Sequence, residues 1–192
     1  MTDNLYKNNS AYTQDIQEIL LSEKDIERKV SQIGGLISRD YLGLNPLLVG
    51  VLKGVLFFMA DLLRSINIPT EIDFIAVANY SAESREQGVV RLVKDLEIPI
   101  SGRHVLFIED VIDTGLTLNY ILQNLRARQP ASLEVCVLFN KPDHRIIDIP
   151  LKYKGFDLPD RFVVGYGLDY RERYRNLPYV GLLRPEIFRG KI

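Results

Sequence analysis

The sequence has very little cysteine and no excess of positive or negative charge. Its single cysteine, Cys136, excludes a disulfide framework and is typical of a protein of the reducing cytosol. Cys136 stands in the apolar run VCVL, which favours a small buried side chain over a nucleophile. The 24 basic and 25 acidic residues leave a net charge of -1, so no global field attracts nucleic acid or an anionic membrane. Any anion must therefore be bound locally.

Long apolar runs and several familiar nucleotide motifs are also missing. No run approaches the roughly 18 apolar residues of a membrane span, and the start MTDNLYKNNS lacks the charged and apolar parts of a signal peptide. We therefore expect a cytoplasmic protein. The glycines spell neither a dinucleotide fingerprint nor a GxxxxGK[ST] loop, so neither a Rossmann dehydrogenase nor a nucleoside triphosphatase is supported.

The length of 192 residues, 46% of them hydrophobic, is enough for the core of one domain. Residues 1–15 are polar and rich in asparagine, and we expect a loose leader there, with the domain spanning 16–192. Ser22 and Asp25 can form a capping box at the start of a helix. Apolar residues then recur at helical spacing, namely Ile26, Val30, Ile33, Ile37 and Tyr41.

Strands and helices are predicted to alternate over the rest of the chain. Short apolar runs predict strands at 47–52, 72–80, 89–93, 105–108, 133–139 and 162–166. Helical patterns fall at about 55–66 and at 114–128. This alternation is typical of a doubly wound α/β fold with a mostly parallel sheet, whose sites open at the carboxyl ends of the strands. The polar stretch SAESREQG at 81–88 is either a plain hairpin connection or a mobile lid.

The stretch VLFIEDVIDTGLT, residues 105–117, carries the clearest chemical signal. An apolar strand runs into a helix start, whose free N–H groups and dipole favour an anion. Gly115 allows close backbone approach, and Thr114 and Thr117 add hydroxyl donors. A phosphate would suit this turn, although Glu109 and Asp110 stand beside it.

Those two carboxylates would repel a phosphate unless a partner neutralised them. Mg²⁺ or a set of sugar hydroxyls could do so, since carboxylates are oxygen ligands that Mg²⁺ prefers. The motif therefore predicts a phosphorylated sugar that carries Mg²⁺. The alternative is that Asp113 caps the helix and that Glu109 and Asp110 lie in a solvated turn.

The motif resembles the phosphoribosyl-pyrophosphate binding motif of the type I phosphoribosyltransferases. Further stretches resemble the hypoxanthine (hypoxanthine-guanine) phosphoribosyltransferases within that family: VGVLKGVLFFMADLLRSI near residue 50, VVRLVKDL near 90, FNK ending at Lys141, and RFVVGYGLDYRERYRNLPYVGLL at 161–183. The resemblance covers about residues 18–188. It implies a single-domain type I fold, with a small hood and a mobile lid loop beside the central sheet.

The resemblance also implies roles for the residues of the phosphoribosyl motif. Glu109 and Asp110 would hold the ribose hydroxyls and a first Mg²⁺. The turn formed by Asp113, Thr114, Gly115, Leu116 and Thr117 would wrap the 5′-phosphate. Asp113 would also face N7 of the purine as a general base or acid.

On the pyrophosphate side, the resemblance assigns Lys53 and Gly54 to the pyrophosphate loop, in which the Leu52-Lys53 peptide is often cis. Arg175 would neutralise the leaving group, and Asp169 would hold a second Mg²⁺. Without the resemblance, Lys53 would be an ordinary lysine at a strand end. Arg171 and Arg173 are expected to be solvated charges.

On the purine side, the resemblance assigns Lys141 to the purine O6, Phe162 to stacking on the base, and the Val163 backbone to the edge of the base. Asp169 lies in the same part of the motif. By themselves, a lysine after a strand would be a surface residue and an apolar pair in a strand would be core.

The implied reaction joins phosphoribosyl pyrophosphate and a 6-oxopurine, hypoxanthine and also guanine, to give the 5′-monophosphate. The chain departs from the family pattern at Asn79 and Gln87, near the expected lid, where relatives carry small hydroxyl residues. We expect altered closure kinetics there. Relatives are dimers or tetramers, so a homodimer or homotetramer is expected.

Two other functions use the same phosphoribosyl motif. Some proteins of this fold are nucleotide-responsive regulators that bind RNA or DNA, and other phosphoribosyltransferases act on other bases. Lys141, Phe162 and Asp169 favour the purine enzyme, and the balanced charge argues against a nucleic-acid surface.

Overall fold

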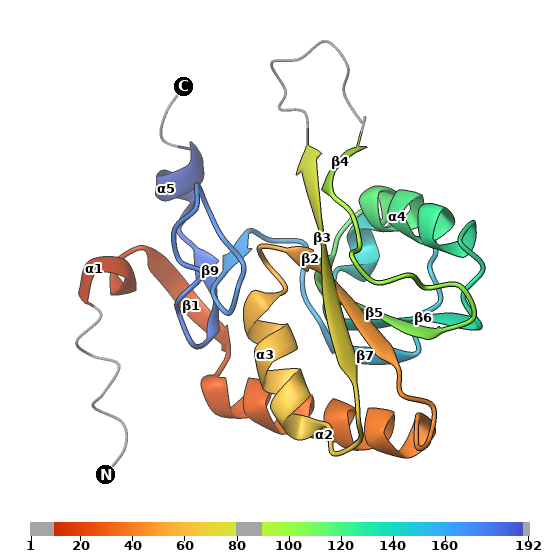
Figure 1. Ribbon diagram of the computed structural model, residues 1–192. Helices are drawn as coiled ribbons and strands as arrows, with labels where there is room; N and C mark the ends of the chain where they lie inside the picture. Colours follow the sequence, from red (N-terminus) through yellow and green to blue (C-terminus); the bar gives the residue numbers. More distant parts are fainter. Residues whose placement is uncertain (1–9, 80–89, 190–192) are drawn as a thin grey trace.

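The main feature of the computed structural model, which describes residues 10–79 and 90–189, is a six-stranded sheet between helices (Figure 1). The strands of this sheet are β2 (Leu47–Leu52), β3 (Glu71–Asn79), β4 (Val90–Lys94), β5 (His104–Ile112), β6 (Ser132–Asn140) and β7 (Tyr153–Asp157). The helices beside it are α2 (Glu23–Asp40), α3 (Leu56–Ser65) and α4 (Leu116–Arg126), with a short 3₁₀ helix, η2 (Pro142–His144), after β6. The predicted α/β class is confirmed.

The strand order β4-β3-β2-β5-β6-β7 places the carboxyl ends of β2 and β5 side by side. The β2–β3, β2–β5, β5–β6 and β6–β7 pairs are parallel, and only β3–β4 is antiparallel. From β2 the chain passes to β3 on one side, whereas β5 leads to β6 and β7 on the other. The gap between the carboxyl ends of β2 and β5 is therefore the topological switch point, where ligands bind in such sheets.

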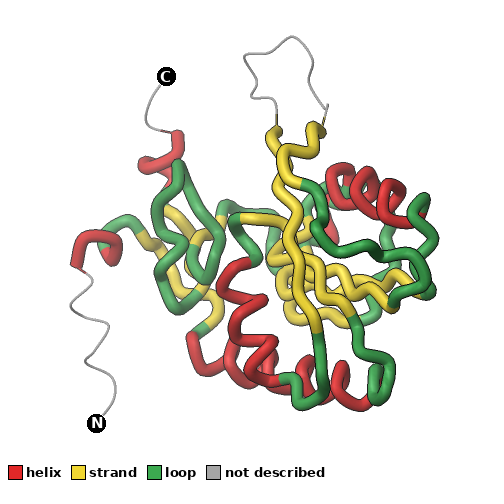
Figure 2. The backbone as a smooth tube through the Cα atoms, viewed as in Figure 1, coloured by secondary structure: helices red, strands yellow, loops and turns green. Residues whose placement is uncertain are grey.

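Both faces of this sheet are buried, which is why its strands read as continuous apolar runs. Side chains alternate along β5, so Leu106 and Ile108 face one hydrophobic cluster while Val105 and Phe107 face another. The first cluster includes residues of α2 and α3, and the second includes residues of α4. The helices thus cover opposite faces, as Figure 2 shows.

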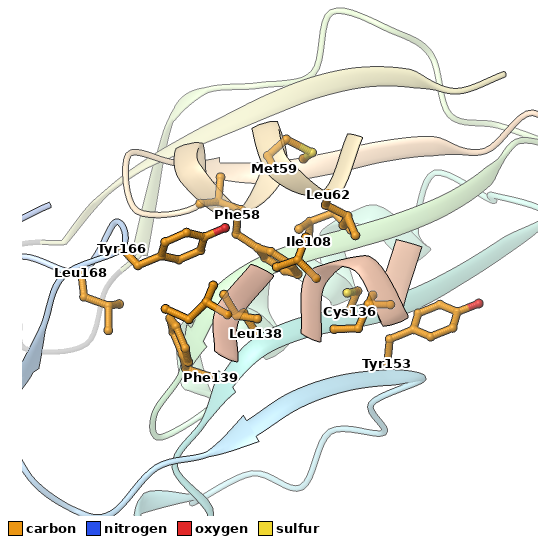
Figure 3. Packing of buried hydrophobic residues seen from close by; sticks show 14 of the residues in the cluster. Phe58, Met59, Leu62, Ile108, Cys136, Leu138, Phe139, Tyr153, Tyr166 and Leu168 are labelled. Atoms are coloured by element: carbon orange, nitrogen blue, oxygen red, sulfur yellow. The ribbon is translucent and has the colours of Figure 1, made fainter. Parts of the chain in front are cut away.

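Figure 3 shows the packing of α3 over the sheet, with Phe58 and Leu62 close to Ile108, in the cluster that also contains Met59 and Cys136. These side chains are at most 1% exposed. The Cys136 thiol is fully buried, as expected, and its burial raises the pKa of that thiol. The α3 helix packs here and fixes the strand β2, which leads into it.

A second, three-stranded antiparallel sheet stands beside the first and corresponds to the expected hood (Figure 1). It comprises β1 (Ile16–Leu21), β9 (Val180–Leu183) and β8 (Val163–Val164), flanked by the short helices α1 (Ser10–Thr13) and α5 (Pro185–Arg189). Neither β1 nor β9 was predicted as a strand, nor was β7 in the large sheet. The helical turn α1 falls within the expected leader, of which residues 1–9 lie outside the described part.

The predicted strand at 162–166 is wrong in extent, because only Val163 and Val164 pair with β9. Gly165 and Gly167 adopt φ values of 102° and 96°, and Gly165 bridges back to Leu168. A left-handed backbone at both glycines turns the chain sharply, which ends the strand after two residues.

The capping box at the start of α2 is confirmed, with the Asp25 N–H donating to Ser22 Oγ and the Ser22 N–H donating to the Asp25 carboxylate. Its predicted apolar face is buried, and Tyr41 is the C-cap. The predicted helix at 114–128 begins two residues later, at Leu116. The segment 81–88, for which a hairpin or a lid was expected, lies outside the described residues, as does Gln87. Asn79 is the last residue of β3.

Within residues 10–79 and 90–189, none of the helices has the length and apolar character that a membrane crossing would require.

Candidate active site

A pocket of about 300 Å³ opens at the switch point between β2 and β5. Its wall is formed mainly by residues 109–115 and 117, together with Gly54 after β2 and Arg175 from the hood side. The motif predicted from sequence and two residues of the expected pyrophosphate side therefore meet in one cavity. The sheet order explains this meeting, since β2 and β5 are neighbours in the sheet, with Leu47 paired to Val105, although they are far apart in the sequence.

Glu109 and Asp110 lie within β5, which runs to Ile112 rather than ending at residue 108 as predicted. The hypothesis that they sit in a solvated turn is therefore wrong. The Glu109 Oε2 atom is buried and has no hydrogen-bond partner within the described part of the chain. Burial and the negative charge of Asp110 raise the pKa of Glu109 well above its ordinary value. Burial likewise raises the pKa of Asp110 to about 6, although the Val111 N–H and Arg175 oppose that shift.

Two adjacent carboxylates with raised pKa values form a site that favours a cation or hydroxyl donors. Shortly after these two carboxylates in the sequence, the helix α4 begins. Gly115 is the N-cap residue of α4, with φ of 82°, and it supplies no capping side chain; the Leu116 N–H makes a long hydrogen bond to Thr114 Oγ1, at 3.4 Å. A Cβ at Gly115 would come within 2.9 Å of the Ile147 carbonyl, so only glycine fits. The first N–H groups of α4 thus lie at the pocket as an anion site.

The loop after β2 approaches the carboxylates very closely. The Leu52-Lys53 peptide is cis, as in the family pattern. A Cβ at Gly54 would lie only 1.9 Å from Asp110 Oδ2, and a Cβ at Gly167 would lie 2.2 Å from the Gly54 carbonyl. The Gly54 backbone is therefore packed between the Asp110 carboxylate and the backbone at Gly167, without room for a side chain at either glycine. This packing brings the loop that contains Gly167, after β8, onto the loop that follows β2.

An ion-pair network of four residues crosses that contact. Its members are Lys53, Asp169, Glu172 and Arg175. Lys53 Nζ lies 3.0 Å from Glu172 Oε2, and Arg175 lies 3.3 Å from Glu172 and 2.9 Å from Asp169. The hydrogen bond to Lys53 lowers the pKa of Glu172 below its ordinary value, and Arg175 adds to this effect. Three of the four residues were predicted site residues, so the structure brings them together.

Lys141 is held close to the motif by its backbone, since the Lys141 N–H donates to the Ile112 carbonyl at 3.0 Å. Its Nζ donates to the Arg161 carbonyl at 3.1 Å. Asp113 directly follows the end of β5, and its side chain is half exposed. Its Oδ1 atom lies 2.6 Å from Nδ1 of His144. Sequence reasoning missed His144, although it follows Lys141 within the stretch KPDH.

Phe162 and Val163 lie at the hood and do not line the pocket. Phe162 is 39% exposed and packs against Phe188 at 5.0 Å and Tyr170 at 5.6 Å between ring centroids. Val163 is buried and pairs with Leu182 in the small sheet. The Arg161 carbonyl that binds Lys141 joins this segment to the rest of the site.

Comparison with known proteins agrees with this architecture. The family model for the phosphoribosyl transferase domain matches residues 13–171. A hypoxanthine-guanine phosphoribosyltransferase of Streptococcus agalactiae is 49% identical over 174 residues, which are 91% of this chain and 97% of the relative. That of Bacillus subtilis is 46% identical over the same shares. A crystal structure of a hypoxanthine phosphoribosyltransferase from Staphylococcus aureus superposes with a TM-score of 0.89 at 45% identity, covering 94% of this chain and 98% of that one.

The fold and the acidic, glycine-lined pocket at its switch point are those of a phosphoribosyltransferase, and the chain belongs to that family. Its similar relatives within the family carry the name hypoxanthine-guanine phosphoribosyltransferase.

Proposed function

We propose that the chain is a purine salvage enzyme that transfers the 5-phosphoribosyl group from phosphoribosyl pyrophosphate to N9 of hypoxanthine, and also of guanine. The products are the 5′-monophosphate and pyrophosphate. One observation carries the proposal: residues 109–115 and Thr117 share a single pocket with Gly54 and Arg175. An anion-binding helix start, two buried carboxylates and a cation thus surround one cavity.

In this proposal, the start of α4 binds the 5′-phosphate. The backbone of Gly115 and Leu116 and the hydroxyls of Thr114 and Thr117 supply donors. Leu116 has an exposed side chain, so its contribution is its N–H group, which donates to Thr114 Oγ1 at 3.4 Å and would turn to the phosphate. Glu109 and Asp110 accept hydrogen bonds from the ribose hydroxyls at the floor of the same pocket.

Lys53, Gly54 and Arg175 bind the pyrophosphate. Lys53 and Arg175 are both paired with Glu172, so these two cations already lie near each other before a polyanion arrives. Gly54 leaves its backbone open to close approach, because it has no Cβ. A bound pyrophosphate would compete with Glu172 for both cations.

The purine lies between the motif and the hood segment. Lys141 Nζ donates to O6 of the base, and the carbonyl of Val163 accepts from its edge. Phe162 stacks on the base, and its exposure of 39% supports this role. Asp169 lies between this purine side and the pyrophosphate side.

The carboxylate oxygens of the pocket are suitable ligands for Mg²⁺. Glu109 Oε2 is a buried oxygen with no protein partner in the described residues, next to the carboxylate of Asp110. Among residues 10–79 and 90–189, no group of three or more His, Cys, Asp or Glu side chains is arranged to hold a metal ion by itself, so the ion would share protein and substrate oxygens. Asp169 is the candidate for a second ion, once its pair with Arg175 opens. Bound Mg²⁺ would neutralise charge on the pyrophosphate.

In the reaction, the N9 lone pair forms a bond to C1′ while the bond from C1′ to the pyrophosphate oxygen breaks. Positive charge builds on the ribose ring, as in other glycosyl transfers. The proton on N7 of the incoming base passes to the Asp113 carboxylate, which leaves a neutral base in the nucleotide. Lys53 and Arg175 stabilise the charge that develops on the departing pyrophosphate.

The test is incubation of the chain with phosphoribosyl pyrophosphate and Mg²⁺ together with hypoxanthine, guanine, xanthine, adenine or uracil, each in a separate reaction. Chromatography of the nucleotide products is the measurement. Hypoxanthine and guanine should give their monophosphates, whereas adenine and uracil should give none. Absence of any 6-oxopurine nucleotide would refute the proposal. The regulator hypothesis gains no support, since the relatives compared above are named as transferases.

We also propose a cytoplasmic homodimer or homotetramer. Leu56, at the start of α3, is 51% exposed, and Leu42, after α2, is 75% exposed. Exposed apolar side chains of this size suit a subunit contact. Light scattering after size-exclusion chromatography should give two or four times the chain mass of 22.0 kDa, and a monomer would refute this assembly.

A further inference from the structure

His144 bridges two carboxylates that come from different loops. Its Nδ1 lies 2.6 Å from Asp113 Oδ1, and its Nε2 lies 2.6 Å from Asp160 Oδ1. Asp113 follows β5, His144 ends the 3₁₀ helix η2 after β6, and Asp160 follows β7. The bridge therefore joins the exits of three successive strands at the edge of the sheet that holds the pocket.

Two contacts of this length determine the protonation of the imidazole. A neutral imidazole has one donor and one acceptor, and an ionised carboxylate only accepts. Both contacts are hydrogen bonds only when His144 is the imidazolium, which donates from both nitrogens. The hydrogen bond to Asp113 accordingly raises the pKa of His144 above its ordinary value, with a further contribution from Asp160.

The other charged groups around His144 have separate partners. On its own segment, Arg145 donates to Asn140 and to the Ile147 carbonyl. Beside Asp160, the Arg161 guanidinium donates to Gln17. Asp143, the preceding residue, is exposed. Asp113 and Asp160 are thus the two carboxylates that contact the ring.

Backbone hydrogen bonds hold the His144 segment against the Asp113 segment on both sides of the pair. On one side the Lys141 N–H donates to the Ile112 carbonyl at 3.0 Å. On the other, the Ile146 and Ile147 N–H groups donate to the Thr114 carbonyl at 3.0 and 3.2 Å. The two segments therefore form one framework, and the His144 ring can hold the Asp113 side chain in a defined position.

We propose that His144 is a positioning residue for Asp113, which it holds through a carboxylate–imidazolium–carboxylate bridge completed by Asp160. The inference rests on the proposed function, in which Asp113 accepts the purine N7 proton. The Asp113 side chain is 53% exposed, so without His144 it would be free to change rotamer. His144 occupies Oδ1 and leaves Oδ2 to face the base. Such orientation of a base by a third group lowers the entropy lost in reaching the reactive geometry.

The kinetic test compares His144→Ala and His144→Gln with His104→Gln. The chain has two histidines, and His104 bonds Ser132 at the opposite end of β5, so it is a matched control. We expect kcat to fall about tenfold or more in both His144 variants, with KM for phosphoribosyl pyrophosphate within about twofold. The control should match the unchanged chain. Unchanged kcat in the His144 variants would overturn the proposal.

The pH profile separates positioning from a merely structural role. His144 has a raised pKa, so the imidazolium and both bonds are present at low pH and are lost as pH rises through that pKa. The kcat of the unchanged chain should therefore show a downward limb as pH rises through the raised pKa of His144, and His144→Gln should lack that limb. A lower kcat with the same limb, together with a lower melting temperature, would assign His144 a structural role and overturn the proposal.

Nuclear magnetic resonance of the two histidine rings tests the bridge without any activity. The His144 signal should titrate at higher pH than an ordinary imidazole, and Asp160→Asn and Asp113→Asn should each move it to lower pH. A His144 titration that is indifferent to both changes would refute the bridge. If the bridge is observed but the unchanged chain forms no 6-oxopurine nucleotide, the proposed function fails and the positioning role fails with it.

Discussion

Asp113 occupies the first position after β5, beside the uncapped start of α4 and 2.6 Å from His144. In the proposed reaction it accepts a proton but does not build the phosphate cradle. Asp113→Asn should therefore lower kcat by about 10²-fold or more, while binding of phosphoribosyl pyrophosphate changes by only a few-fold. Steady-state kinetics and equilibrium titration measure the two quantities.

A suitable control for that change is Asp148→Asn, which removes the same charge from an exposed residue after η2. It should retain the kcat of the unchanged chain. Near-normal turnover in Asp113→Asn would remove Asp113 from proton transfer.

Lys141 is the residue that we expect to read the 6-oxo group. Its position is set by its own backbone bond to Ile112, so a change of side chain leaves the loop in place. Lys141→Gln should erode the preference for hypoxanthine over adenine by roughly tenfold, because a neutral amide discriminates O6 from an amino group less strongly. The ratio of kcat/KM for the two bases is the measurement, and an unchanged ratio would exclude Lys141 from the base site.

At the scale of elements, helix α2 contains two adjacent glycines with opposite surroundings. A Cβ at Gly34 would lie 2.6 Å from Cβ and the carbonyl oxygen of Ser65 on α3, whereas a Cβ at Gly35 would meet nothing within 4 Å. Gly34→Ala should lower the free energy of unfolding by about 1–3 kcal/mol, because the helices must separate. Gly35→Ala should raise it by about 0.5–1 kcal/mol through helix propensity. Urea unfolding of both variants measures the contrast, and similar effects would contradict this packing.

Most elements of the large sheet could be predicted from sequence, because strands buried on both faces and amphipathic helices leave strong apolar patterns. The strands β1, β7 and β9 could not. In β1, IQEILL shows no regular alternation, and its pairing with β9 shifts register twice. The partner strand, β9, is more than 150 residues away in the sequence. The strand β1 therefore depends on a long-range pairing, which the local sequence does not encode.

The candidate site could be predicted where neighbouring residues supply the chemistry. Residues 109–117 form one continuous motif, and in the structure all of them except Leu116 line one pocket. The pairing of Lys53 with Glu172 and of His144 with Asp160 could not be predicted, since each joins two loops whose approach depends on the sheet order and on the glycine contacts of Gly54 and Gly167.

At the scale of the whole molecule, Asp73 links stability to pH. It is 7% exposed in β3, and it accepts hydrogen bonds from the Phe74, Glu97 and Ile98 N–H groups and from Lys94. Burial alone would raise the pKa of Asp73, but these donors outweigh it and lower the pKa below its ordinary value. Stability from Asp73 is therefore present above the unfolded-state pKa of about 4 and is lost as pH falls through the lower folded-state value.

Asp73→Asn should lower the free energy of unfolding at neutral pH by about 2 kcal/mol, because an amide nitrogen cannot accept these hydrogen bonds. The loss should shrink as pH falls below about 4. Urea unfolding at a series of pH values measures this, with the exposed Asp148→Asn as the control. A loss that does not vary with pH would show that Asp73 acts by packing alone.

Because Cys136 is buried, the reactivity of its thiol can be used to measure how often the molecule opens. The thiol is the one cysteine in the sequence and lies, fully covered, between the sheet and the layer of α2 and α3. A thiol-specific reagent can reach it only after those helices leave the sheet, so its labelling rate under native conditions tracks the population of opened molecules. Ligand binding at the far edge of the sheet should slow that labelling, which would allow affinity for phosphoribosyl pyrophosphate to be measured by chemical protection without any turnover.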